Sequence, residues 1–491
     1  MSSPLALLDE LLAAVGRDRA EGGGGATITG ADPVFPLPLR TGEAGAAAIA
    51  ATGLAAAELW RLRSAVEQRV SVDVRAASAG MRSGRYLRVE RDNDAVQKVA
   101  PGIRSAVAGM YEARDGRWIY LHCNFAHHRE RIRSLLDCDD DRESFARAVS
   151  GWDAAELEQA VVDGGACAGL IRTAERWAAG GPAQAVAELP LLEVEQIGES
   201  PPEAPGESAG RSGGSGAGGN RGNQSNRGDR PLSGVRVLDL TRVLAGPTCA
   251  RTLAEHGADV LRIGHAGLPE HGLHTIDTGH GKRSAVLDLQ SAEGGERLHA
   301  LARVADVFSQ GYRPGSMAAR GFSPEAMAQA RPGVIYVTLS AFGHAGPWAQ
   351  RRGFDTLVQS VSGFSHEYAT AEGEPRLLPV SALDYITGYI AAFGVMEALR
   401  RRATAGGSYL VRVSLAQTGR WLASLPRVPV EQVAAAGEDL TPEEIAALST
   451  TTDSAFGRIS YLAPIAQLPE TPARWERSAV PLDHGEATWL D

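Results

Sequence analysis

The sequence predicts an α/β protein whose second half folds into a parallel sheet covered by helices. From Pro231 onward, short apolar runs typical of strands alternate with helical runs, and this alternation indicates parallel strands joined by helices. The expected strands are 235–240, 258–263, 304–308 and 334–339, with a short extended piece at 284–289. The expected helices between them are 246–255, 292–302 and 324–330.

The first half of the chain mixes helices and strands with no such regular alternation. In chain order, the pattern predicts helices at 5–15, 44–63, 127–136, 142–149, 153–163 and 172–186, and strands at 68–74 and 192–197. Asp115-Gly116 stands between two alternating segments, which is typical of a β-hairpin. The helix at 44–63 is strongly Ala-rich.

A segment of different composition separates the two halves. Residues 198–230 are rich in Gly, Ser, Pro and Asn and have almost no apolar content, so they predict a flexible linker. The resulting division is a first half at 1–197, the linker, a sheet-containing domain at 231–425 and a C-terminal closing segment at 426–491.

The composition excludes several classes of protein. The 491 residues suffice for two to four domains, and a hydrophobic content of 44% allows a sizeable core. A net charge of −10 argues against a nucleic-acid-binding surface. The four cysteines are scattered without a CxxC, the N-terminus lacks the basic start of a signal peptide, and no run of about 18 apolar residues appears. We therefore expect a cytoplasmic protein with no disulfides, no membrane span and no nucleic-acid partner.

Ligands of parallel α/β sheets bind beyond the carboxyl ends of the strands. In this sequence the predicted strands end at 240–247, 264–265, 309–315 and 340–346. We expect the functional site to be assembled from these segments.

Asp384 is the first candidate for a catalytic residue. It stands where an irregular, Pro-containing segment gives way to a long helix, expected from Tyr385 to Arg402, and it is placed as the N-cap of that helix. Free N–H groups and the macrodipole at a helix N-terminus stabilise a carboxylate as the anion. A positioned, ionised carboxylate can attack an activated acyl group. The simpler interpretation is that Asp384 only caps the helix, because Asp is among the commonest caps.

The chain contains an internal repeat at an offset of 341 residues. Ile390–Val395 match Ile49–Leu54 at this offset without a gap. The same offset pairs Asp384 with Glu43, Arg402 with Arg61, Val411 with Val70, Val413 with Val72 and Leu415 with Val74. The helix and strand that begin at Asp384 are therefore predicted to occur twice, unless two Ala-rich helices resemble each other by chance.

A series of motifs in the second half resembles the family III CoA-transferases of the CaiB/BaiF type. The motifs are Pro231–Thr241, Leu244–Pro247, Gly281–Ser284 with Leu287-Asp288-Leu289, Tyr312–Gly315, Gly353-Phe354-Asp355, and Leu383-Asp384 with Gly388. None of these motifs is specific alone. Their order along the chain makes the likeness specific.

The resemblance implies a Rossmann-like large domain, a smaller α+β domain and, in most members, an interlocked homodimer. It implies a coenzyme A thioester as substrate, a small carboxylic acid as acceptor and no tightly bound cofactor. Asp384 falls at the position of the nucleophile, which attacks the thioester carbonyl to give a mixed anhydride. The CoA thiolate then returns to form an aspartyl-CoA thioester, from which CoA passes to the acceptor. Backbone N–H groups, Gly363 among them, are candidates to hold the oxyanion.

The first half resembles other parts of the same family in a different order. Residues 43–75 resemble the helix and strand that follow the catalytic Asp, and residues 110–197 resemble the small domain that comes later in the family. We infer one complete enzyme built from a rearranged, partly duplicated chain, with Glu43 as a relic at the position of the nucleophile.

The resemblance also assigns CoA-binding positions. These are Arg242, Ala245, His265, Leu287, Tyr312 and Arg313, and Lys282 and Arg352 are further candidates for phosphate contacts, although any one of these cations is most simply a solvated surface charge. Where relatives carry polar or basic groups toward CoA, this chain has Arg242, Leu244, His265, Gln290, Gly311 and Ala319, and only Ala245, Leu287 and Tyr312 are of the usual type. These departures leave open a catalytically silent CoA-binding or scaffold homologue.

An acyl-CoA racemase on the same fold is a third hypothesis. Phe354 stands where the racemases of this family carry His, which counts against it. Asp355 is a second candidate carboxylate, which we expect to be structural and to hold the loop that faces Asp384. His122, Cys123, His127 and His128 are close in sequence, but no second ligand pair is obvious, so we expect no metal site. No GxGxxG follows the strand at 235–240, which argues against NAD.

Overall fold

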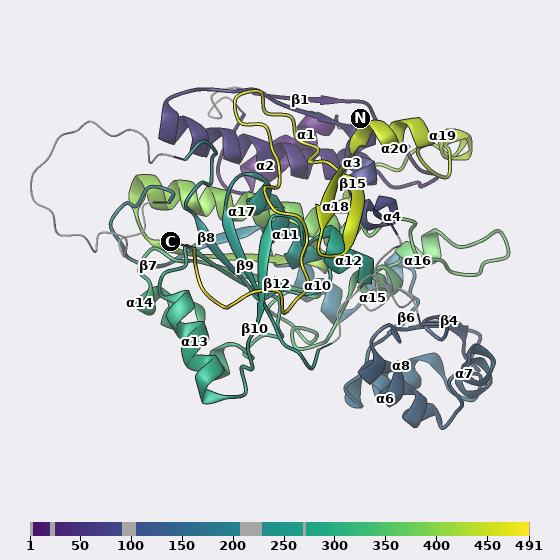
Figure 1. Cartoon of the computed structure of the whole chain (residues 1–491). Helices are drawn as coiled ribbons and strands as arrows, with labels where there is room; N and C mark the ends of the chain where they lie inside the picture. The colour runs from purple at the N-terminus through teal and green to yellow at the C-terminus, as the bar shows by residue number, and fades with distance from the viewer. Residues whose placement is uncertain (1–2, 20–24, 91–104, 207–227, 269–271, 491) are drawn as a thin grey trace, which may run out of the picture.

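Seven strands form the central sheet of the computed structural model, which describes residues 3–19, 25–90, 105–206, 228–268 and 272–490 (Figure 1). Their order across the sheet is β10-β9-β8-β11-β12-β13-β7. The first six all pair in parallel and belong to the second half: β10 (Lys282–Val286), β9 (Asp259–Gly264), β8 (Arg236–Asp239), β11 (Val307–Gln310), β12 (Ile335–Ser340) and β13 (Ser408–Ser414). The parallel sheet expected from the sequence is therefore confirmed.

The seventh strand comes from the first half of the chain. β7 (Glu193–Gly198) pairs antiparallel with β13, and Val194 lies opposite Val411. The Arg412 guanidinium binds the carboxylates of Glu193 and Glu195 at 2.7 Å and 2.9 Å across this pair. The first half is thus built into the edge of the main sheet.

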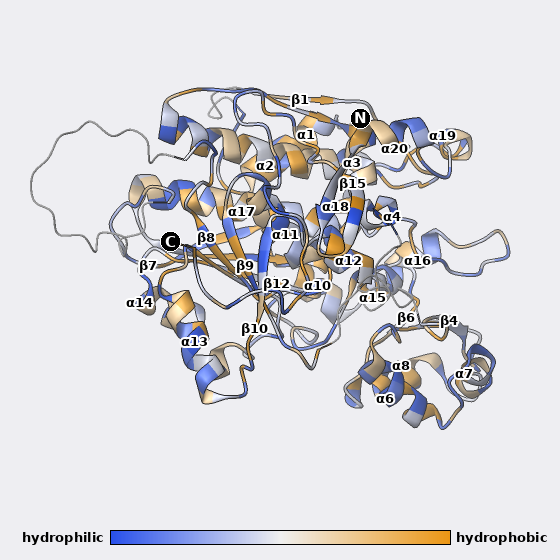
Figure 2. Ribbon diagram, in the orientation of Figure 1, coloured by the Kyte–Doolittle hydropathy of each residue, from blue (hydrophilic) through white to orange (hydrophobic). Residues whose placement is uncertain are grey.

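Helices cover both faces of the sheet because its strands are apolar on both sides, as expected for parallel strands. Val237 and Val260 belong to a core shared with α11 (Ala245–Glu255) and α17 (Ala382–Ala405). Leu238 and Leu261 point to the other face, into a core shared with α13 (Ala292–Ala302) and α14 (Pro324–Ala330). Figure 2 shows the apolar colouring of the strands between these helix layers.

A third layer, from the first half, packs over α17. α1 (Pro4–Ala13) and α2 (Thr41–Ser64) lie above α17 in Figure 1, and their apolar residues belong to the core that contains α17. α17 is buried on all sides from Ala382 to Leu399. It is the one helix of the described residues that is long and apolar enough to cross a membrane, and its apolar stretch lies wholly inside the protein.

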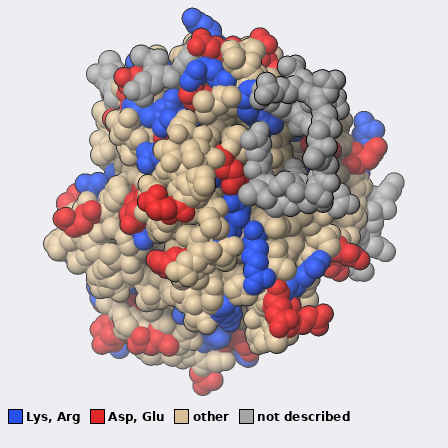
Figure 3. All heavy atoms as spheres, turned by 90° about the vertical axis from the view of Figure 1, so that its left-hand side faces the viewer, with Lys and Arg blue, Asp and Glu red and all other residues tan. Residues whose placement is uncertain are grey.

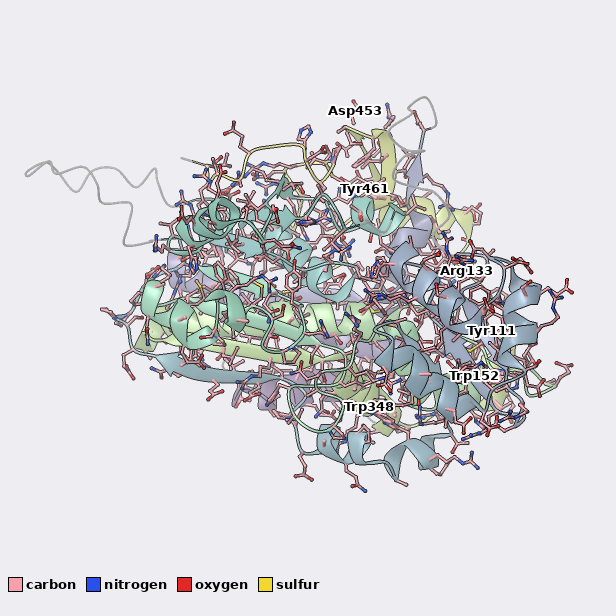
Figure 4. The ribbon with its side chains drawn as sticks, turned by 90° about the horizontal axis from the view of Figure 1, so that it is seen from below. Tyr111, Arg133, Trp152, Trp348, Asp453 and Tyr461 are labelled. Atoms are coloured by element: carbon pink, nitrogen blue, oxygen red, sulfur yellow. The ribbon has the colours of Figure 1, made fainter. Side chains whose placement is uncertain are left out.

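Residues 105–171 form a unit with its own core, at the lower right of Figure 1. Its antiparallel sheet consists of β4 (Gly109–Glu112), β5 (Trp118–Leu121) and β6 (Ala168–Leu170), covered by α6 (Ala126–Leu136), α7 (Arg142–Val149) and α8 (Ala154–Asp163). Asp115-Gly116 turns between β4 and β5 as predicted, with Gly116 at φ +71°. Tyr111, Arg133 and Trp152 mark this unit in Figure 4.

The remaining elements complete the two halves. They are β1 (Ala26–Thr29), β2 (Val70–Asp73), α3 (Val74–Gly80), α4 (Ser83–Tyr86), β3 (Arg88–Val89), α9 (Ala174–Ala178), α10 (Gly181–Ala187), α12 (Gly272–Asp277), the 3-10 helix Ala318–Arg320, α15 (Asp355–Val361), α16 (Phe364–Glu367), α18 (Leu415–Ser424), α19 (Val430–Ala435), α20 (Pro442–Leu448), β14 (Ser449–Ser454) and β15 (Gly457–Leu462). β15 pairs with β3 of the first half. The tail then crosses the second half, where the Trp475 and Trp489 indoles donate to the carbonyls of Arg251 and Leu301.

Several predicted boundaries differ from the observed ones. The helix expected at 172–186 is two helices, α9 and α10, separated at Ala179-Gly180, and Pro182 in the first turn of α10 disfavours a continuous helix. The extended piece expected at 284–289 is β10, which begins two residues earlier. Most of the predicted linker, residues 207–227, lies outside the described residues.

On the face shown in Figure 3, acidic and basic side chains are interspersed among uncharged residues.

Candidate active site

A cleft of ≈ 340 Å³ opens at the carboxyl ends of the parallel strands. The segments that line it follow β8, β11 and β12, precede α15, and include part of the 105–171 unit. β8 and β11 are neighbours in the sheet although β9 and β10 lie between them in sequence, so the connections diverge to opposite sides at this point. Such a switch point is where open α/β sheets bind ligands.

Asp384 lies in the wall of this cleft. It is in the first turn of α17, which begins at Ala382, so the predicted N-cap position is wrong and Ser381 occupies it. The Asp384 residue is 8% exposed, and that exposure faces the cleft. Its carboxylate is therefore accessible without being solvated on all sides.

Asp355 fixes the backbone that carries Asp384. The Asp384 N–H donates to Asp355 Oδ2 at 3.0 Å, and the Gln359 amide donates to Asp355 Oδ1. Gln359 Oε1 in turn accepts the Leu378 N–H at 2.8 Å. A carboxylate satisfies both donors because each of its oxygens accepts. The predicted structural role of Asp355 agrees with these contacts.

Both carboxyl groups titrate at higher pH than ordinary aspartates. Burial, followed by the negative charge of Asp355, raises the pKa of Asp384 well above its usual value, and the Ala245 backbone N–H partly opposes this rise. Burial raises the pKa of Asp355 to about 6, while hydrogen bonds from the Asp384 backbone and Gln359 lower it. Burial therefore disfavours both anions, and an ionised Asp384 is more weakly solvated and more basic than an ordinary aspartate.

The N-terminus of α11 faces Asp384. In the first turn of this helix, the N–H groups of Ala245 and Gly246 have no helical carbonyl acceptor four residues earlier. Pro247 has no N–H group, so it leaves no donor unpaired. A Cβ on Gly388, one turn after Asp384, would lie 2.5 Å from the Ala245 carbonyl oxygen. Glycine at 388 is what allows α11 to approach Asp384 this closely.

For the CoA transfer that the sequence resemblance implies, we expect Gly388→Ala to lower the rate about 10²-fold, because the added methyl displaces the α11 N-terminus from Asp384 by a fraction of an ångström or more. Gly295 is the matched control, since it is also helical and a Cβ there meets nothing within 4 Å. Gly295→Ala should leave transfer unchanged and stabilise the fold by about 0.5–1 kcal/mol. Steady-state transfer rates and thermal unfolding of both variants check this, and equal rates would contradict it.

The turn between β8 and α11 is held by a buried ion pair. Lys282 Nζ donates to Asp239 Oδ2 and to the Pro247 carbonyl, each at 2.9 Å, and neither side chain is more than 2% exposed. Asp239 Oδ1 also accepts the Thr241 N–H at 2.9 Å. Within this turn Val243 has φ +73°, a conformation that a β-branched residue adopts only under constraint. The turn is therefore rigid and shaped to the cleft it lines.

Four arginines give the cleft a positive lining: Arg242, Arg313, Arg351 and Arg352. Two of them are oriented by the 105–171 unit, since Arg351 pairs with Glu158 at 2.9 Å and Arg352 donates to the Gly165 carbonyl at 2.9 Å. Arg313 is exposed at the rim. Such a set suits an anionic ligand that carries phosphate or carboxylate groups.

The first half contributes a wall that sequence reasoning did not include among the site residues. Phe125, His127 and His128 line the cleft opposite the strand ends. The neighbouring His122 ring stacks on Phe354 at a centroid distance of 4.0 Å, which attaches this wall to the loop before α15. Burial lowers the pKa of His128 to about 3, so its imidazole is neutral. The closeness of three histidines in sequence was the only signal for this wall.

The structure brings together most of the residues singled out from the sequence. Asp384 lines the cleft together with Arg242, Ala245, Tyr312, Arg313 and Arg352. Their individual roles in binding remain predictions. Among the described residues, no three His, Cys, Asp or Glu side chains come together in a way that could hold a metal ion.

Four other residues named from the sequence lie elsewhere. The Lys282 ammonium is ion-paired with the buried Asp239 and does not line the cleft, so a phosphate contact from it does not fit the structure. His265, after β9, lies 3.5 Å from Asp288, and Leu287 packs against the core beneath α13. Gly363 precedes α16 and is packed against Ala174, away from the cleft, which argues against its oxyanion role.

We predict that the acid limb of the pH–rate profile depends on Asp355. In the reaction that the sequence resemblance implies, attack requires ionised Asp384, so we expect the rate to fall as pH drops through the raised pKa of this carboxyl. Asp355→Asn and Asp355→Ala both remove the charge that raises this pKa, so both should move the acid limb to lower pH. Asn keeps one oxygen that can accept the Asp384 N–H and loses only the acceptor of the Gln359 amide, whereas Ala removes both acceptors, so Ala should lower the plateau rate more. Profiles of kcat/KM against pH for both variants measure this, and an unmoved limb would contradict the coupling.

The sequence profile of the family described as CoA-transferase family III matches residues 232–447. An acetyl-coenzyme A transferase (nodX) of Hypoxylon pulicicidum is 37% identical over 199 residues, which cover 39% of this chain and 34% of that protein. An acyl-CoA transferase of Gibberella moniliformis is 28% identical over 422 residues, 78% of this chain and 70% of that protein. Human succinyl-CoA:glutarate CoA-transferase is 30% identical over 219 residues, 42% of this chain and 50% of that protein. The chain thus spans a third to a half of two of these relatives.

Proposed function

We propose, from the membership of residues 232–447 in CoA-transferase family III, that this protein transfers coenzyme A from an acyl-CoA to a carboxylic acid through Asp384. The observation that carries the proposal is the position of Asp384. Its carboxylate opens into an arginine-lined cleft at the strand ends and faces the N-terminus of α11. A reactive carboxylate, a place for phosphates and a positive helix end are the three features that the reaction needs.

In the first half-reaction, Asp384 supplies the attacking oxygen. A carboxylate oxygen bonds to the thioester carbonyl carbon, the C–S bond breaks, and the CoA thiolate leaves from a mixed anhydride. The thiolate then attacks the Asp384 carbonyl carbon of the anhydride, and the donor acid leaves as its carboxylate. The product is an aspartyl-CoA thioester.

The second half-reaction reverses these steps with the acceptor. The acceptor carboxylate attacks the aspartyl-CoA carbonyl and expels the thiolate, which gives a second anhydride. The thiolate attacks the acceptor's own carbonyl carbon, and Asp384 leaves as the carboxylate. Each tetrahedral intermediate carries negative charge, and the N–H groups at the start of α11, which faces Asp384, are candidates to stabilise it.

The proposal includes the architecture around the site. The six parallel strands follow the order 3-2-1-4-5-6 along the chain, which is that of Rossmann-like sheets, and we infer that the large domain is of this type. We further infer that the 105–171 unit is the small domain, which supplies Phe125, His127 and His128 to the cleft. No tightly bound cofactor is required, because CoA is itself a substrate. We place the protein in the cytoplasm, which supplies acyl-CoA.

Trapping with hydroxylamine tests the proposal. Incubation with an acyl-CoA should form the aspartyl-CoA thioester. Hydroxylamine then attacks its carbonyl, CoA thiol leaves, and Asp384 becomes a hydroxamate that mass spectrometry of the digested protein locates. Activity should be lost in parallel. An unmodified Asp384 in protein that binds acyl-CoA would instead support the silent CoA-binding homologue. Exchange of the α-hydrogen without an acceptor would support the racemase.

A further inference from the structure

The internal repeat found in the sequence is also present in the fold. α2 (Thr41–Ser64) and α17 (Ala382–Ala405) are both 24 residues long, and each boundary of α17 lies 341 positions after that of α2. β2 corresponds to the last four residues of β13, and α3 and α18 begin at the equivalent residues Val74 and Leu415. Chance similarity of two Ala-rich helices does not account for matching strands and helix starts beyond them.

Side-chain contacts of the two copies also correspond. A Cβ on Gly53 would lie 2.6 Å from Val70 Cγ1, and a Cβ on the equivalent Gly394 would lie 2.8 Å from Cγ1 of the equivalent Val411. β1 pairs in parallel with β2 as β12 pairs with β13. Both copies therefore pack a long helix onto a two-strand parallel unit through the same glycine.

The correspondence extends to the buried carboxylates. The Glu43 N–H donates to Asp32 Oδ2 at 2.8 Å, as the Asp384 N–H donates to Asp355 Oδ2 at 3.0 Å. Asp32 follows β1, and Asp355 follows β12. Burial raises the pKa of Asp32 to about 7, as it raises that of Asp355. The first copy thus retains the arrangement that positions the nucleophile.

Two differences prevent the Glu43 carboxylate of the first copy from forming a site like that of Asp384. The Arg40 guanidinium binds the Glu43 carboxylate at 2.7 Å, and the Glu43 side chain is 2% exposed. Position 47, equivalent to Gly388, is Ala, so a helix N-terminus cannot approach there as α11 approaches Gly388. The Glu43 carboxylate is ion-paired with Arg40 and enclosed, whereas Asp384 lines a cleft.

The first copy instead contacts the helix that carries Asp384. α2 packs along α17, and the Ser381 N–H donates to the Met81 carbonyl at 3.2 Å, three residues before Asp384. The Tyr385 hydroxyl, next to Asp384, accepts from Ser83 Oγ at 3.0 Å. These contacts join the end of the first copy to the start of α17.

We propose that residues 26–86 take the place that a second copy of the active-site unit would occupy, so that the active site is complete within a single chain and Glu43 is silent. The labelling experiment for this inference depends on the proposed function, whereas the mass measurement does not. It replaces the homodimer implied by the resemblance with an intramolecular pairing of the two copies.

Native mass spectrometry combined with dilution assays tests the single-chain arrangement. We expect a species with the mass of one chain, 51.6 kDa, whose specific activity is unchanged on dilution. An active species found only as a dimer, with activity that falls on dilution, would overturn the arrangement. A single-chain mass without any transfer would count against the proposed function and leave the pairing of the copies supported.

Labelling of matched variants tests the silence of Glu43. Hydroxylamine should trap one carboxylate per chain, at Asp384, and Glu43→Gln should keep the label and transfer within about threefold of the parent rate. The double variant Arg40→Gln/Glu43→Gln, which leaves no unpaired charge, serves if Glu43→Gln alone fails to fold. A label at Glu43, or loss of transfer in the folded double variant, would overturn the proposal.

Discussion

Replacement of Asp384 by Asn is expected to abolish CoA transfer, with a loss of at least about 10⁴-fold in kcat. The amide keeps the size of the side chain but has no anionic oxygen to attack the thioester, so neither the anhydride nor the aspartyl-CoA thioester forms. Binding of CoA should change little, because the arginines that line the cleft are untouched. Steady-state rates, hydroxylamine trapping and CoA affinity, measured on the same preparation, check all three expectations.

The same substitution should not destabilise the fold at neutral pH. The pKa of Asp384 is higher in the folded protein than in an unfolded chain, so the folded state binds more protons between those two pKa values. The carboxyl therefore weakens the fold as pH rises through this window, and the amide does not. We expect the thermal midpoint of Asp384→Asn to equal or exceed that of the parent above the raised pKa, and this advantage to disappear at low pH. A variant that is both inactive and unstable at neutral pH would point to a structural role instead.

Local signals in the sequence predicted much of the fold because they depend on short-range chemistry. α13, α14 and α7 begin and end where the pattern placed them, and the Ser291 and Ser323 side chains cap α13 and α14. The repeat was visible because its two copies share residues at fixed spacing. The start of α17 was missed because Ser381, not Asp384, is the N-cap, and no side-chain hydrogen bond marks that position.

The parts of the site that the sequence did not reveal depend on long-range packing. Phe125 and His128 reach the cleft because the 105–171 unit, which has its own core, packs against the second half through the Glu158–Arg351 ion pair. No pattern within residues 105–171 encodes that placement. In the same way, nothing local distinguishes Lys282, which is buried, from Arg283, whose guanidinium pairs with Asp259 nearer the surface. Lys282 was a candidate for a phosphate contact, and the structure assigns it to the core.

Replacement of Lys282 by Met is therefore expected to cost about 3–5 kcal/mol of folding free energy, although the position is outside the cleft lining. The methionine fills the space of the lysine stem but leaves the buried Asp239 carboxylate without its cation. It also removes the hydrogen bond to the Pro247 carbonyl that holds the start of α11 beside Asp384. Equilibrium unfolding in denaturant measures the loss, and transfer assays on the folded fraction should show a lower kcat.

The neighbouring residue provides the control for this prediction. Arg283→Met removes an ion pair with Asp259 whose side chains are 18% and 17% exposed, which should cost about 1 kcal/mol, less than the loss of the fully buried pair. The double variant Lys282→Met/Asp239→Asn removes the unpaired charge and keeps an acceptor for the Thr241 N–H, so it should recover a large part of the lost stability. If Lys282→Met were no more harmful than Arg283→Met, the ion pair would not be what holds the β8–α11 turn. The rigid approach of α11 to Asp384 would then need another cause.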